Sequence, residues 1–155
     1  MDQAAVAGIQ IPVNELIAPV RFPTPEQVRV LRQSYAMLEP AGDLVATLFF
    51  RRLDKIAPET RAMLPAGEQE QHQQLWSSLA LAIASLDRFD DIIPALKLLG
   101  LRFRALGVNE IHYGAVGEAL LWTLDCSLGH KCTPDVFDAW TAFCAEIAEI
   151  MTAAR

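Results

Sequence analysis

The fold is decided by the stretch at residues 99–108, which reads LGLRFRALGV. Leu99, Phe103 and Leu106 recur here at helical spacing, with Leu96 one turn upstream. The spacing predicts a helix over about 90–106 with one apolar face. In the middle of that face Phe103 carries a phenyl ring, which has no lone pair to give to a metal.

The same helical pattern continues on both sides of this stretch. Thr24-Pro25-Glu26-Gln27 combines a threonine cap, a proline at the first helical position and a glutamine three residues after the cap, and Thr133-Pro134-Asp135 begins in the same way. The expected helices cover about 24–38, 43–55, 59–63, a longer segment through 75–86, then 90–106, 110–128 and the stretch from 133 onward. No segment alternates with a period of two, so we expect an all-α fold.

Composition indicates one globular domain. The chain has 155 residues, of which 52% are hydrophobic and 21% charged, enough to bury a core without disulfides or a structural metal. A net charge of −6 argues against nucleic acid and against an anionic membrane surface as partners. Three cysteines do not make a disulfide framework, no apolar stretch is long enough to cross a bilayer, and the first residues lack the positive flank of a secretory signal. We therefore expect a cytoplasmic protein.

The first 23 residues differ from the rest. Pro12, Pro19 and Pro23 interrupt them, yet they are rich in isoleucine, leucine and valine. We expect residues 1–23 to form an N-terminal extension, packed on the domain or on a partner, ahead of a domain at 24–155.

Four strings in order suggest a family. They are FFRRLDKIAPE at 49–59, LGLRFRALGV at 99–108, HYGAVGEALL at 112–121 and DAW at 138–140. Together they resemble the globin family over about residues 24–153, in particular single-domain bacterial haemoglobins and the haem domains of flavohaemoglobins. The resemblance implies a globin fold with helices A, B, C, E, F, G and H.

The resemblance also implies which residues would line the haem pocket. Phe103 occupies the position of the proximal histidine, and Gln71 that of the distal residue that gates ligands. Phe50 stands where the bacterial branch often has a tyrosine, and Leu64 where the family has a phenylalanine against the porphyrin. Tyr113 matches a proximal tyrosine, but its glutamate partner falls on Arg155. The implied pocket positions are Phe50, Leu64, Gln71, His72, Leu75, Phe103 and Tyr113.

The missing iron ligand favours a protein without cofactor. We expect a haem-free globin fold that acts as a sensory, apolar-ligand-binding or protein-interaction module, with Phe103 closing a hydrophobic core. A homodimer through the last two helices, a signalling protein and a small apolar ligand are the partners considered, and no enzymatic activity is expected.

Two alternatives remain open. In the first, the protein binds haem for oxygen or nitric oxide, with a non-standard iron ligand: either His72, or water with the haem held weakly by the pocket. The polar run around His72 favours a surface or rim position for this residue. In the second, it is a nitric oxide dioxygenase served by a separate reductase.

Two further groups of residues are interpreted as structural. Cys126, His130 and Cys132 lie close together in the sequence, but we interpret them as ordinary residues of an interhelix corner rather than as a zinc site. His112 is interpreted as a capping or surface residue.

Overall fold

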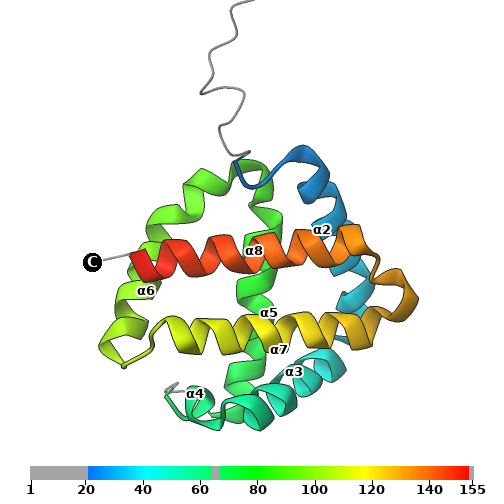
Figure 1. Ribbon diagram of the computed structural model, residues 1–155. Helices are drawn as coiled ribbons and strands as arrows, with labels where there is room; N and C mark the ends of the chain where they lie inside the picture. Colours follow the sequence, from blue (N-terminus) through cyan, green and yellow to red (C-terminus); the bar gives the residue numbers. More distant parts are fainter. Residues whose placement is uncertain (1–20, 64–66, 154–155) are drawn as a thin grey trace, which may run out of the picture.

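The computed structural model describes residues 21–63 and 67–153, and this part of the chain contains helices and no strand (Figure 1). The α-helices are α2 (Pro25–Leu38), α3 (Gly42–Ile56), α4 (Pro58–Ala62), α5 (Glu68–Ala84), α6 (Ile93–Ala105), α7 (Glu110–Leu128) and α8 (Pro134–Ala153), and short 3-10 turns are η1 (Glu39–Ala41), η2 (Leu86–Ile92) and η3 (Gly129–Lys131). The all-α prediction is confirmed. Most of the expected N-terminal extension, residues 1–20, lies outside the described residues.

The predicted helix starts are present as capping boxes or prolines. The Thr24 hydroxyl accepts a hydrogen bond from the Gln27 backbone N–H at 3.1 Å, and the Gln27 side chain accepts one from the Thr24 N–H at 2.8 Å. At the start of α7, Asn109 caps the Ile111 N–H, and the Asn109 N–H donates to His112 Nδ1 at 2.9 Å. His112 is therefore a capping residue, as predicted.

One helix begins later than expected. The prediction placed it from about residue 90, whereas α6 begins at Ile93 after the turn η2. Arg88 inside η2 has φ −140° and ψ 47°, which no α-helix accommodates. This bend lets Leu86 and Phe89 both enter the core, where they are 2% and 4% exposed.

The core lies where α8 crosses the other helices. Trp140 of α8 is fully buried, and its indole N–H donates to the equally buried Ser34 hydroxyl of α2 at 2.8 Å. Helices α7 and α8 run antiparallel across the front of Figure 1, with α3 packed on α7 and α6 packed on α8. Gly100 makes the α6–α8 crossing close, because a Cβ there would lie 2.2 Å from the Met151 carbonyl oxygen.

Helix α6 is attached on one side only. It packs against α8 and η2, while no extensive packing joins it to α5 or α7 within the described residues. Leu98, Leu101 and Leu106 of this region are 54%, 38% and 44% exposed. None of the described helices is both long and apolar enough to span a membrane.

Candidate functional site

Phe50 joins three helices at one point. This buried side chain of α3 has the His72 imidazole of α5 stacked on it, with ring centroids 4.9 Å apart and an interplanar angle of 1°. The guanidinium carbon of Arg61, from the short helix α4, lies 4.7 Å from the Phe50 ring centroid. The proline-started helix α4 thus brings a cation to the same phenyl ring that the α5 histidine contacts.

Arg61 is held by groups on both neighbouring helices. Its Nη1 donates to Asp54 Oδ2 of α3 at 2.6 Å, and its Nε donates to Gln71 Oε1 of α5 at 2.9 Å. The Arg61 side chain is 19% exposed and Gln71 is 5% exposed. The arginine charge is therefore compensated by a carboxylate, and the orientation of the Gln71 carbonyl is set by the arginine fork.

His72 presents a buried nitrogen without a partner. Its Nε2 atom is inaccessible to solvent and has no hydrogen-bond partner among the described residues. A buried polar atom in this state costs about 1–3 kcal/mol, and a neutral imidazole nitrogen is also a common metal ligand. The His72 side chain as a whole is half-buried, and Phe50 covers one face of its ring.

Phe103 does not close a core. It is half-buried on α6 and lies outside the cluster of core side chains and the partly buried residues that pack on it. The expectation of a hydrophobic core sealed by Phe103 is therefore wrong. Phe103 lies one turn beyond Gly100, which meets Met151 of α8, but its ring is not among the side chains that pack on the core cluster.

The remaining predicted pocket residues are spread over the fold. Leu75 of α5 is half-buried and packs on the core cluster. Tyr113 lies on α7, where its hydroxyl is buried without a hydrogen-bond partner and burial raises its pKa above the ordinary value. Leu64 and Arg155 lie outside the described residues. The structure thus brings Phe50, Gln71 and His72 together, with Phe103 and Tyr113 on separate helices.

Sequence reasoning missed Arg61. Its partners Asp54 and Gln71 are seven and ten residues away in the chain, so no local pattern connects them. The one available signal was the proline at the start of α4, which predicts a short helix there but not the direction of its side chains.

In the corner between α7 and α8 that contains two cysteines, Cys126 is exposed and Cys132 is half-buried. Residues 21–63 and 67–153 contain no group of three or more His, Cys, Asp or Glu side chains that could hold a metal ion.

Comparison with known proteins places this helical arrangement in a family. The family model described as globin matches residues 48–151. A flavohaemoprotein of Bacillus subtilis is 27% identical over 125 residues, which are 79% of this chain and 31% of the relative. A flavohaemoprotein of Deinococcus radiodurans is 28% identical over 131 residues, 83% of this chain and 32% of the relative. The chain thus spans about a third of the length of these relatives.

A solved structure shows the same fold. It is an engineered carbene transferase made from a candidate nitric oxide dioxygenase of Rhodothermus marinus, with a TM-score of 0.73, 22% sequence identity, and 84% of this chain and 91% of that chain covered. The predicted globin fold is confirmed. The expectation that the chain has no enzymatic activity is wrong in the light of these matches. The relatives are named flavohaemoproteins, and the fold neighbour carries the name of an enzyme.

Proposed function

Because the chain belongs to the globin family, we propose that it binds haem for oxygen or nitric oxide, with His72 as the iron ligand. The observation that carries this proposal is the buried, unpartnered Nε2 atom of His72. It replaces the haem-free, sensory function expected from the sequence, for which neither the relatives nor the geometry offers support.

The residues around His72 suit a ligand of this kind. The parallel contact with Phe50 limits rotation of the imidazole, so that its ring nitrogen is held in one orientation. Nothing among the described residues competes for that nitrogen, and a neutral imidazole can give its lone pair to iron. When bound, haem supplies an iron centre that coordinates small gas molecules.

Phe103 has a different part in this proposal. Its ring cannot coordinate iron, but a half-buried phenyl group outside the core is a suitable apolar surface for the face of a macrocycle. Leu106, three residues further along the chain, is 44% exposed and adds apolar surface. Gln71 and Arg61 form the polar part of the site near Phe50.

A second candidate is the oxidation of nitric oxide with oxygen. The observation that favours it is the similarity to flavohaemoproteins and to the fold of a candidate nitric oxide dioxygenase. This activity requires electrons, and the similarity to those relatives covers only about a third of their length. A flavin reductase would therefore have to serve this domain, and catalytic turnover with an added reductase is the measurement that separates this activity from simple binding.

Titration with haemin tests the proposal. The wild-type chain should develop a saturable Soret band at one haemin per chain, and His72→Ala should lose it or shift it to the position of a weakly held, five-coordinate haem. His130→Ala is the matched control, because His130 is an exposed histidine of η3 and should titrate like the wild type.

Two different results would contradict haem binding and the assignment of His72 separately. A wild-type chain without a saturable Soret band would overturn haem binding as a whole. An unchanged band in a folded His72→Ala protein, with helicity checked by circular dichroism, would overturn only the assignment of His72.

A further inference from the structure

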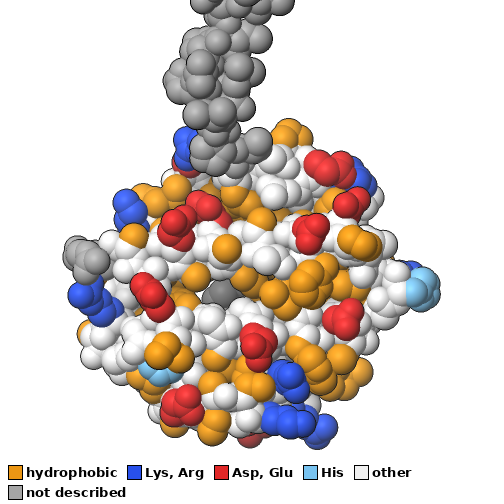
Figure 2. Space-filling model, in the orientation of Figure 1, with side chains coloured by type: hydrophobic (Ala, Val, Ile, Leu, Met, Phe, Trp, Pro, Cys, Tyr) orange, Lys and Arg blue, Asp and Glu red, His pale blue; other side chains and the backbone are white. Residues whose placement is uncertain are grey.

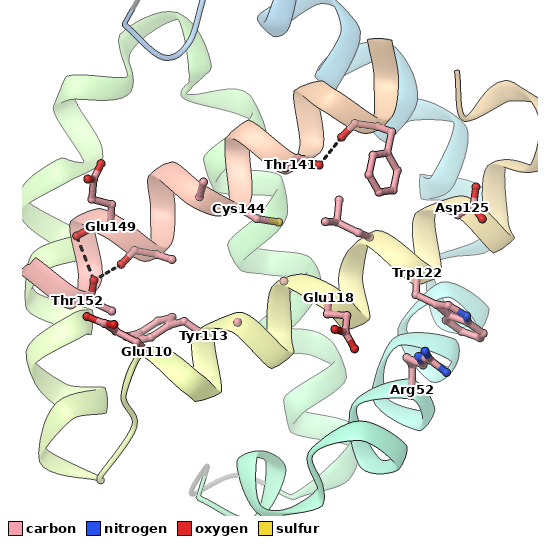
Figure 3. A pocket seen from close by; sticks show the side chains of 16 residues that line it. Arg52, Glu110, Tyr113, Glu118, Trp122, Asp125, Thr141, Cys144, Glu149 and Thr152 are labelled. Atoms are coloured by element: carbon pink, nitrogen blue, oxygen red, sulfur yellow. Dashed lines mark hydrogen bonds between the residues drawn. The ribbon is translucent and has the colours of Figure 1, made fainter. Parts of the chain in front are cut away.

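A groove extends along α7, with α8 on one side and Arg52 of α3 on the other (Figure 3). It has a volume of about 690 Å³ and is open to solvent. Among the residues that line it are the small residues Gly114 and Gly117 on α7 and Ala145 and Ala148 on α8. Larger apolar side chains stand toward the other end of the groove, where Trp122 is 36% and Phe137 39% exposed.

The small residues on the α7 side are not required by packing within the chain. A Cβ added at Gly114 would meet no atom within 4 Å, and one at Gly117 would come no closer than 3.8 Å to Cys144 Cβ. Glycine in a helix interior costs about 1 kcal/mol relative to alanine. The fold itself therefore gives no reason for two glycines here, whereas an external helix lying close to α7 would.

The margins of the groove are acidic. The charged residues that line the groove are four carboxylates and one cation, Arg52. The carboxylates belong to Glu110, Glu118, Asp125 and Glu149. Arg52 lies over the Trp122 ring, 4.9 Å from its centroid. None of the four carboxylates forms an ion pair within the described residues. Figure 2 shows this face, with hydrophobic side chains between α7 and α8 and carboxylates beside them.

We propose that this groove binds a cationic amphipathic helix of a partner protein. The apolar face of that helix would rest on the small residues and on Trp122, and its lysine or arginine side chains would pair with the four carboxylates. Charge complementarity decides the occupant. A second copy of this chain would bring the same four carboxylates into a symmetric interface, where like charges oppose each other. The inference depends on the groove alone and not on haem binding.

Synthetic peptides serve as the probe. One is a 14-residue amphipathic helix of leucine and lysine, and its twin carries glutamate in place of every lysine. Binding to the full chain is measured by calorimetry and by tryptophan fluorescence, to which Trp76, Trp122 and Trp140 all contribute. The lysine peptide should bind one to one, at least about ten-fold more tightly than the glutamate peptide, and its affinity should fall as salt is raised.

Two double variants of equal net charge locate the binding. Glu118→Gln with Asp125→Asn removes two carboxylates of the groove and should weaken the lysine peptide by about ten-fold. Glu70→Gln with Asp91→Asn removes two exposed carboxylates elsewhere and should change the affinity by less than about two-fold. Gly117→Leu should block binding of the lysine peptide beside α7 without changing any charged residue.

Three results would overturn the proposal. Equal affinity for the two peptides would remove the charge argument. Equal weakening in the two double variants would mean that the peptide binds the overall negative charge and not the groove. A stable dimer in light scattering that Gly117→Leu dissociates would make a second copy the occupant.

Discussion

The His72 imidazole lies parallel to the Phe50 ring, with 4.9 Å between the centroids and an angle of 1° between the planes. This contact joins α3 to α5 and leaves His72 Nε2 buried without a hydrogen-bond partner. Phe50 thus connects the stability of the fold with the orientation of the residue that we propose as the iron ligand.

Replacing Phe50 should weaken the fold first. Phe50→Ala removes a side chain that is 5% exposed, together with its contacts to His72 and Arg61, and should lower the free energy of unfolding by about 3–5 kcal/mol. Phe137→Ala is the control, because Phe137 is 39% exposed and should lose at most about 1 kcal/mol. Urea denaturation of both variants measures the difference. Similar losses would mean that Phe50 is not a central contact.

Giving α6 a histidine should provide an additional iron ligand. Phe103 is half-buried outside the core, so Phe103→His should change the free energy of unfolding by no more than about 1 kcal/mol. With haemin, the variant should show a Soret band shifted from that of the wild type. The decisive protein is Phe103→His combined with His72→Ala. If it binds no haemin while the single Phe103→His variant does, position 103 does not face the site.

The helix starts and most helix lengths were predictable because their causes are local. Thr24 and Thr133 precede prolines, and the cap geometry at Thr24 depends only on residues within one turn. The bend at Arg88 was not predictable. It is imposed by the burial of Leu86 and Phe89 in a core that other helices build, and the nearby aspartates read equally well as a helix start.

The candidate site was only partly predictable for the same reason. Phe50, Gln71 and His72 came from spacing within a family pattern, and the structure does bring them together. The role of Arg61 and the groove along α7 arise from packing between helices, which no single-helix pattern contains. Phe103 was expected to close the core because a phenyl ring stands at the iron-ligand position, but the residue type alone does not reveal whether other side chains pack against it.

Two glycines should respond in opposite directions to alanine. Gly100→Ala would place Cβ 2.2 Å from the Met151 carbonyl oxygen and should lower the free energy of unfolding by more than about 2 kcal/mol, because backbone atoms must move apart. Gly114→Ala meets nothing within 4 Å and should raise that free energy by about 0.5–1 kcal/mol through helix propensity. Thermal unfolding measures both. Destabilisation by Gly114→Ala would show that this position is constrained within the chain after all.

The thiol of Cys144 should make stability depend on alkaline pH. Burial raises the pKa of Cys144 from 9.0 to about 12. Above pH 9 the unfolded chain loses this thiol proton while the folded chain keeps it, so the free energy of unfolding falls as pH rises from about 9 toward 12. The slope from this one group is on the order of 1 kcal/mol per pH unit, and below pH 9 its contribution is constant.

Other groups also titrate between pH 9 and 12, so the readout is the difference in the free energy of unfolding between wild type and Cys144→Ala, measured by urea denaturation across that range. Cys126→Ser is the control, because Cys126 is exposed and its replacement should leave the slope of the wild type unchanged. A Cys144→Ala protein with the full wild-type slope would assign the alkaline loss of stability to other residues.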